Sequence, residues 1–282
     1  MATIIDGKEL SKKLKEQMKD RVAQMRQQGI VPKLVVVLVG NNSASEVYVR
    51  NKHKACGEVG IESEVIKMPE ETTQQELLDV VKGLNEDRTV DGILVQLPLP
   101  GQINEKVVLR SILPEKDVDG FHPVNVGLLS IGDDCYAPAT PSGIIAMFKE
   151  YGIEIAGKHC VIIGRSNIVG KPMAALLLRH NATVTVCHSK TKNLGELTRQ
   201  ADIVIVATGH RHTLTADMVK EGAVVIDVGM NRNELGKLCG DVDFEEVKEK
   251  ASFITPVPGG VGPMTITELL ENTILAAQRH HS

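Results

Sequence analysis

Hydrophobic and polar positions in the first half of the chain alternate in a pattern typical of repeated strand and helix units. Residues 4 to 28 carry apolar side chains at helical spacing, and this pattern stops at Gly29. The continuous apolar run LVVVLVG, residues 34 to 40, is typical of a parallel strand buried on both faces. The elements expected next are a helix over residues 43 to 60, a strand over 61 to 68, a helix opened by Thr72 or Thr73, and a strand over 92 to 98. This order predicts a parallel sheet with helices on both faces.

A second alternating series begins near residue 158, after an irregular stretch from residue 114 to 141. The expected strands cover residues 160–164, 183–187, 203–208 and 223–229, and helical segments are expected near 171–180, 193–200 and 215–221. We therefore predict an α/β fold with two domains, residues 1–140 and 141–264. The second is expected to be a Rossmann-type doubly wound parallel sheet. A last helix, residues 265–282, could return to either domain.

Three helix starts are predicted from residue types that cap helices. Ser43 is the expected N-cap of the helix over residues 43 to 60, with Glu46 at the spacing of a capping box. Thr140 is expected to open a helix at the domain boundary. Thr265 and Glu268 have the capping-box spacing at the start of the last helix.

Composition excludes several classes of partner. The 282-residue chain has a formal net charge of −4, only 2% aromatic residues and no Trp, which argues against a nucleic-acid partner. No apolar run approaches the roughly 20 residues of a membrane span, and the start MATIIDGKEL lacks a signal-peptide pattern, so we expect a cytoplasmic protein without a membrane partner. His53 and Cys56 are three residues apart, but two candidate ligands do not make a metal site, and none is predicted.

A glycine-rich turn follows the strand over residues 160–164. Its sequence, GRSNIVGKP, runs from Gly164 to Pro172 and leads into a helix, so backbone N–H groups and the helix dipole favour a pyrophosphate there. The match to G-x-G-x-x-G is imperfect, because Ser166 replaces the second glycine and Gly170 comes one residue late. An ordinary tight turn between strand and helix is also compatible with this loop.

The end of the next strand favours NADP over NAD. An NAD-binding unit usually has an acidic residue there that reaches the ribose hydroxyls. Here the strand is followed by HSKTK, residues 188–192, and Arg165 projects into the same neighbourhood. Hydroxyl and cationic groups suit a 2′-phosphate. A solvated basic turn is the alternative interpretation.

Four polar residues of the first domain are expected at the carboxyl ends of its strands. Tyr48 and Lys52 are four residues apart, so they share a helix face. A lysine at a crevice can have its pKa lowered and act as an acid or base. Gln96 ends the buried run GILVQ, residues 92–96, and Asp119 lies in the irregular segment, where loops often carry function. Each of the four also has an ordinary structural interpretation; their expected convergence is the argument for a site.

A second unusual loop lies near the C-terminus. PVPGGVGPMT, residues 256–265, holds three prolines and three glycines. Proline fixes φ and glycine opens angles that other residues avoid, so this loop is expected to bring bare backbone close to a ligand.

Five motifs in order resemble those of the bifunctional methylenetetrahydrofolate dehydrogenase/methenyltetrahydrofolate cyclohydrolase family: YVRNKHKAC, DGILVQLPLP, KDVDGFHP, GRSNIVGKP and TPVPGGVGPMT. The resemblance covers essentially the whole chain. It implies two α/β domains facing each other across a cleft, with the last helix packed on the first domain, and a homodimer formed through the cofactor domains. The implied activity is NADP-dependent oxidation of 5,10-methylenetetrahydrofolate and hydrolysis of the product to 10-formyltetrahydrofolate, in one-carbon metabolism and purine biosynthesis.

The resemblance also implies a role for each site residue. Lys52 is similar to the catalytic lysine of the cyclohydrolase step, Gln96 to the glutamine that tunes it, Tyr48 to the tyrosine that stacks near the folate ring, and Asp119 to the acid that anchors the pterin. The implied NADP contacts are Gly164, Arg165, Ser166, Ser189 and Met230. Leu97, Pro258, Gly259 and Gly260 complete the implied folate site.

Three alternatives stay open at this point. The chain could be a dehydrogenase-only member of the same family, although a titrating residue at Lys52 argues against it. It could be a different NADP-linked Rossmann dehydrogenase acting on a small hydroxy acid, such as a shikimate-type enzyme. It could also be a silent module that binds NADP without turnover.

Overall fold

The computed structural model describes residues 1–281, and its chain divides into two compact units. Unit 1 comprises Met1–Lys12 and Pro138–Thr265, and unit 2 comprises Lys13–Ala137 and the residues from Ile266 onward. Unit 1 corresponds to the second expected domain, but it also contains residues 1–12, which the expected division assigned to the first domain. They belong to unit 1 because β1 (Thr3–Ile4) pairs in parallel with β11 (Phe253–Ile254).

Unit 2 is built on a three-stranded parallel sheet in the order β3-β2-β4. Its strands are β2 (Lys33–Val39), β3 (Glu62–Met68) and β4 (Gly92–Val95). Val35 pairs with Glu64 on one side and Ile93 on the other, so β2 is the central strand. Val35 and Val36 point to opposite faces and both are fully buried, as predicted for a strand covered on both sides.

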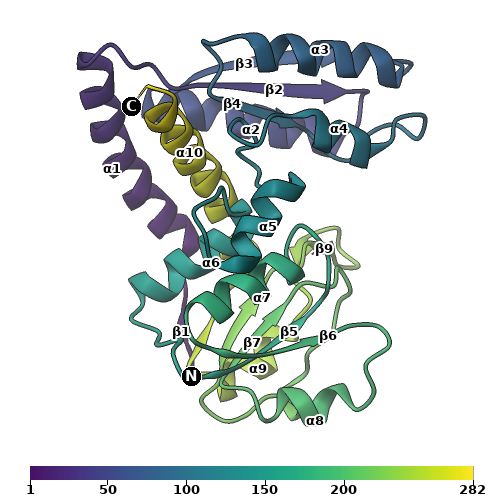
Figure 1. The fold of residues 1–282 in the computed structure, drawn as a ribbon. Coiled ribbons are helices and arrows are strands. Elements are labelled where there is room, and N and C mark those ends of the chain that lie inside the picture. Colours follow the sequence, from purple (N-terminus) through teal and green to yellow (C-terminus); the bar gives the residue numbers. More distant parts are fainter. Residues whose placement is uncertain (282) are drawn as a thin grey trace. The chain divides into compact units, whose positions relative to one another are not determined.

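Helices cover the sheet of unit 2 (Figure 1). They are α2 (Ser43–Val59), α3 (Gln74–Glu86) and α4 (Glu105–Ser111). A further helix of the same unit, α5 (Pro123–Ile131), follows the irregular segment. Leu77 of α3 and Val108 of α4 belong to one apolar cluster with Val35 of the sheet, so these two helices share a face. α10 (Val261–His280) enters this unit at residue 266, where Asn272 Nδ2 donates to the carbonyl oxygens of Val118 and Ala137 at 2.8 and 3.0 Å.

Unit 1 contains a six-stranded parallel sheet in the order β1-β11-β8-β7-β5-β6. Its longer strands are β5 (His159–Ile163), β6 (Thr183–Cys187), β7 (Ile203–Val206) and β8 (Val224–Asp227). The chain goes from β5 to β6 on one side and then to β7 on the other. This reversal is the switch point at which doubly wound sheets bind ligands, at the carboxyl ends of the strands.

The remaining elements of unit 1 are short, apart from two helices. They are α6 (Ala139–Glu150), α7 (Gly170–Arg179), α8 (Leu194–Thr198), the 3₁₀ turn η1 (Ala216–Met218), the hairpin β9 (Asn231–Arg232) and β10 (Leu238–Cys239), and α9 (Phe244–Lys250). α1 (Gly7–Gln27) begins in this unit and continues into unit 2. Among residues 1–281, no helix is both long and apolar enough to cross a membrane.

The predicted caps are wrong for three helices. Asn42, not Ser43, caps α2, and its side chain accepts from the backbone N–H of Ser45 at 3.0 Å. α6 and α10 begin four or fewer residues before the predicted starts, so Thr140 and Thr265 lie inside them, where their hydroxyl groups are 2.8 Å apart. Helix stability in proteins comes mostly from tertiary packing, so a local capping preference does not by itself decide where a helix begins.

Candidate active site

The side chains of Lys52 and Gln96 meet in unit 2. Lys52 lies on α2, and its Nζ donates to Gln96 Oε1 at 3.1 Å. Gln96 follows β4 directly, with its backbone N–H bonded to Val37 O at 2.9 Å. Its Nε2 donates to Leu97 O at 2.8 Å, which fixes the amide with its oxygen toward the lysine. Tyr48 precedes Lys52 by one turn of the same helix and is half-buried.

Burial and a nearby carboxyl group set the charge of this lysine. Burial lowers the pKa of Lys52, and the negative charge of Asp119 opposes that change. Burial raises the pKa of Asp119, and Lys52 opposes it in turn. A lysine with a lowered pKa is closer to the pH at which it can both give and take a proton. The pair therefore has the electrostatics of a site that exchanges protons.

Asp117 supports the loop that carries Asp119, and the sequence interpretation did not include it. Its Oδ2 accepts from the backbone N–H of His122 at 2.7 Å and from Asn125 Nδ2 at 2.9 Å, and its backbone bridges to Ile93 of β4. Asp117 is 1% exposed. Burial, with a smaller contribution from Asp119, raises its pKa to about 7.

Replacing Asp117 with asparagine should flatten the pH dependence of stability. The carboxyl has an ordinary pKa of 3.8 and a folded pKa of about 7, so the folded state holds a proton that the unfolded state has lost between these values. This group therefore adds to the free energy of unfolding below pH 3.8. Its contribution, at most about 4 kcal/mol, is lost as the pH rises to about 7. Urea midpoints from pH 4 to 8 should fall with pH in the wild type and fall less in D117N.

Asp20→Asn is the matched control, because Asp20 is an exposed aspartate of the same unit. It should keep the wild-type slope. An unchanged slope in D117N would show that the Asp117 carboxyl does not titrate in this range.

The glycine-rich loop in unit 1 wraps closely on itself between β5 and α7. A Cβ on Gly170, the first residue of α7, would lie 2.2 Å from Gly164 O, and one on Gly164 would lie 2.3 Å from Ala207 O. Gly164 has φ +136°, a region that favours glycine. Ser166 Oγ accepts from the backbone N–H of Val169 at 3.1 Å. The loop thus leads exposed backbone into the N-terminus of a ten-residue helix, the arrangement of an anion site.

The other predicted cofactor residues also follow carboxyl ends of strands. Ser189 comes two residues after β6, and Met230 three residues after β8. Arg165, Ser189 and Met230 are all exposed, as a ligand at this edge requires. His188 N donates to Thr191 Oγ1 at 2.8 Å, which shapes the turn that presents Ser189. These residues fit a nucleotide cofactor at the switch point of the sheet.

The start of α1 supports the loop of Pro258, Gly259 and Gly260. The backbone N–H of Lys8 donates to Gly259 O at 3.1 Å. A Cβ on Gly7 would lie 1.9 Å from Gly260 O, so a residue without a side chain is needed at position 7. The sequence interpretation missed this support because the two segments lie at opposite ends of the chain. The loop belongs to unit 1, whereas Lys52 and Gln96 belong to unit 2.

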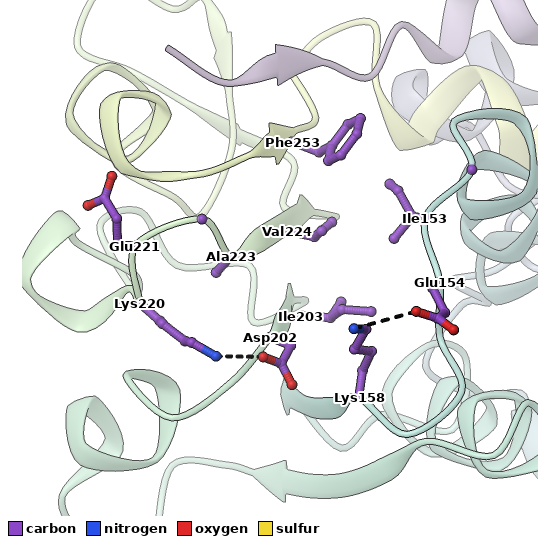
Figure 2. Close-up of a pocket in the computed structure, with 12 residues that line it drawn as sticks. Ile153, Glu154, Lys158, Asp202, Ile203, Lys220, Glu221, Ala223, Val224 and Phe253 are labelled. Carbon is purple, nitrogen blue, oxygen red and sulfur yellow. Dashed lines mark hydrogen bonds and ion pairs between the residues drawn. The ribbon is translucent and has the colours of Figure 1, made fainter.

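A separate pocket of about 310 Å³ lies at the opposite edge of the unit 1 sheet (Figure 2). It is lined at the amino ends of β7, β8 and β11 by Ile203, Val224 and Phe253. Two ion pairs border it: Lys220 to Asp202 at 2.6 Å and Lys158 to Glu154 at 3.6 Å. Ligands of doubly wound sheets bind at the carboxyl ends of strands, so this pocket is not the candidate nucleotide site.

Comparison with known proteins assigns both parts of the chain. Residues 5–119 match the family model described as tetrahydrofolate dehydrogenase/cyclohydrolase, catalytic domain, and residues 138–281 match its NAD(P)-binding domain. The chain is 58% identical over 278 residues to the bifunctional protein FolD of Oceanobacillus iheyensis, covering 99% of this chain and 98% of that protein.

Two solved structures are also similar. The bifunctional FolD methylenetetrahydrofolate dehydrogenase/cyclohydrolase of Campylobacter jejuni has a TM-score of 0.98 and 55% identity, with 99% of each chain covered. The Trypanosoma brucei enzyme, solved with NADP cofactor and inhibitor, has a TM-score of 0.94 and 39% identity, with 99% of this chain and 98% of that chain covered.

Proposed function

Because the chain belongs to the tetrahydrofolate dehydrogenase/cyclohydrolase family, we propose that it catalyses two consecutive reactions of a folate substrate. It oxidises 5,10-methylenetetrahydrofolate with NADP and hydrolyses the methenyl product to 10-formyltetrahydrofolate, a reaction sequence of one-carbon metabolism. The contact between Lys52 Nζ and Gln96 Oε1 carries the proposal, because the second reaction needs a group that moves protons.

The residues of unit 1 hold the cofactor for the first reaction. NADP, when bound, accepts the hydride from the methylene bridge of the substrate. The turn from Gly164 to Ser166 and the N-terminus of α7 bind the pyrophosphate, and Arg165 and Ser189 bind the 2′-phosphate. Met230 lines the same edge. Holding two reactants at a fixed distance and orientation is the contribution of the protein to this step.

The residues of unit 2 act in the second reaction. Water adds to the electrophilic methenyl carbon. The bond from this carbon to one of its two nitrogens then breaks, which opens the ring and leaves the formyl group on the other nitrogen. Lys52, with its lowered pKa, takes and returns the protons of these steps. Gln96 holds the amine through its amide oxygen.

The remaining side chains bind the folate. Tyr48 lies against its ring and Asp119 accepts hydrogen bonds from the pterin. Leu97 and the loop of Pro258, Gly259 and Gly260 form further contacts. Residues 1–140 with the last helix form the folate-binding domain, and residues 141–264 form the NADP-binding domain. Residues 1–12 are the exception, because their strand β1 pairs with the sheet of the NADP-binding domain.

We further propose that the protein is a cytoplasmic homodimer that supplies formyl groups for purine biosynthesis. The basis is the family resemblance. Sedimentation of the purified protein tests the dimer: a single species of monomer mass at micromolar concentration would contradict it.

A time-resolved spectrum tests the two activities. The protein is mixed with 5,10-methylenetetrahydrofolate and either NADP or NAD, and samples are quenched in acid, which regenerates the methenyl chromophore. We expect reduction of NADP, with methenyl absorbance that appears only after acid. Methenyl that accumulates without acid would indicate a dehydrogenase alone and would contradict the role of Lys52. No reaction with either cofactor would favour a silent nucleotide-binding module.

A further inference from the structure

A buried carboxylate, Asp241, lies beneath the loops at the carboxyl ends of β7 and β8. It is 0% exposed. Its Oδ2 accepts three hydrogen bonds from the end of β7: from Thr208 N at 2.6 Å, Thr208 Oγ1 at 2.9 Å and Gly209 N at 2.9 Å. Its Oδ1 accepts from Asn231 Nδ2, at the start of β9 in the segment that follows β8, at 2.8 Å. One side chain therefore links the loops that follow two neighbouring strands.

A second buried carboxylate holds the segment that carries Asp241. Asp227, the last residue of β8, is 3% exposed. Its Oδ1 accepts from the backbone N–H groups of Gly229 and Asp241, and its Oδ2 from that of Val242, each at 2.9 Å. Burial, and then the like charge of Asp241, raises the pKa of Asp227 to about 6. Seven hydrogen-bond donors surround these two buried carboxylates. Burying two like charges side by side costs folding free energy, which suggests that the protein uses the geometry they impose.

Two glycines allow the carboxylates to approach the backbone. A Cβ on Gly229 would lie 2.2 Å from Asp241 Oδ1, and one on Gly240 would lie 1.8 Å from Asp227 Oδ2. The segment after β8 and the segment before α9 therefore pack directly against each other. Between them they include Met230, which is 55% exposed at the nucleotide edge.

The end of β7 is also in contact with the glycine-rich loop. The backbone N–H of Ala207 donates to Ile163 O at 2.8 Å, and Ala207 O would lie 2.3 Å from a Cβ on Gly164. A displacement of residues 207–209 would therefore reach Gly164. The carboxylate of Asp241 is fully buried, so it is not part of the surface that a nucleotide would touch.

We propose that Asp241 is a positioning residue for the cofactor: it holds the Thr208–Gly209 loop and the Met230–Asn231 segment in the arrangement that binds NADP. This inference rests on the proposed placement of NADP at the carboxyl edge of the sheet. A carboxylate suits the task because both of its oxygens accept and neither donates. An asparagine would turn an NH₂ group toward one of the donors, either those of the β7 loop or Asn231 Nδ2.

The test exchanges the two partners of one hydrogen bond. D241N turns an amide toward the amide of Asn231, and N231D brings a second carboxylate against Asp241. The double variant D241N/N231D again has one carboxylate and one amide across the 2.8 Å contact. The dissociation constant for NADP is measured by calorimetry at 25 °C, since the chain has no Trp to report binding. Far-UV circular dichroism checks that each variant is folded at that temperature.

We expect each single variant to bind NADP at least about tenfold more weakly and the double variant to recover part of that loss. At saturating NADP the kcat of D241N should stay within about threefold of wild type, because a positioning residue acts on cofactor affinity. D243N is the matched control. It removes a carboxylate two residues away, whose side chain is 31% exposed and pairs with His212, and it should bind as wild type does.

Folded D241N that binds NADP as tightly as wild type would overturn the proposal. So would a double variant whose fold-loss of affinity equals the product of the two single losses, because the contact between residues 231 and 241 would then contribute nothing. Asn231 Nδ2 also donates to Gly240 O at 3.0 Å, and the loss of that bond cancels in this comparison because N231D and the double variant share it. A wild-type protein that binds no NADP would contradict the proposed function itself, which separates the two failures.

Discussion

Replacing Lys52 with methionine is expected to reduce methenyltetrahydrofolate hydrolysis by at least about 100-fold, the lower end of what a positioned proton-transfer group contributes. Methionine keeps an unbranched side chain in the same space, but it cannot take or give a proton. It also leaves Gln96 Oε1 without the donor now 3.1 Å away. The dehydrogenase reaction should lose less, because hydride transfer requires no proton from Lys52. Two rates are measured for each variant: the loss of methenyl absorbance, which reports hydrolysis, and the formation of NADPH, which reports the dehydrogenase reaction.

Lys54→Met is the matched control on the same helix. The Lys54 side chain is 77% exposed and pairs with Glu58. Its loss should change neither rate by more than about twofold, as expected for a surface ion pair. If K52M hydrolyses the methenyl substrate as fast as K54M does, the proton-transfer group is elsewhere.

The second large effect is expected at Gly170. Alanine there should raise the KM for NADP by on the order of 100-fold, the loss that an ångström-scale misplacement produces in a binding site. The added Cβ would lie 2.2 Å from Gly164 O and 2.9 Å from the Cα of Arg165. Both are backbone atoms, so the glycine-rich loop must move and lose its fit to the pyrophosphate. Initial rates at varied NADP measure the effect.

Gly195→Ala controls for a glycine replaced in a helix of the same unit. Its Cβ would meet Arg199 Nη1 and Met218 Cγ at 3.1 and 3.3 Å, which are parts of flexible side chains. Its KM for NADP should stay near the wild-type value. A wild-type KM in G170A would show that the loop tolerates the displacement, and the phosphate site would have to be placed elsewhere.

The long strands could be predicted because strands buried on both faces consist almost entirely of apolar residues. LVVVLVG and the strand ending at Ile163 are continuous apolar runs, and both were confirmed as parallel strands within one or two residues. β1 and β11 could not be predicted in this way. Each has two residues, and what makes them strands is their pairing, Thr3 with Phe253.

The same distinction applies to the candidate site. Lys52 and Gln96 could be proposed because Lys52 lies on the helix that follows β2 and Gln96 directly follows β4. Asp117 and Asp241 could not. Their significance depends on the hydrogen-bond donors that the fold collects around them, and Asp241 draws these from residues 208, 209 and 231. A carboxylate in a loop has the same sequence signature whether it is solvated or buried.

The two units are interleaved along the chain, and this has a consequence for synthesis on the ribosome. Residues 13–137 emerge early, but their unit lacks α10 until residues 261–280 have also been made. Leu269, Leu270 and Ile274 of that helix are at most 1% exposed, so the apolar surface they cover stays bare in the nascent chain. The sheet of unit 1 likewise waits for Phe253 before β1 has a neighbour. At ordinary elongation rates of about 5–20 residues per second, residues 13–137 therefore wait roughly 6–26 s for residue 266 to be made, and their uncovered apolar surface is exposed to aggregation during that time.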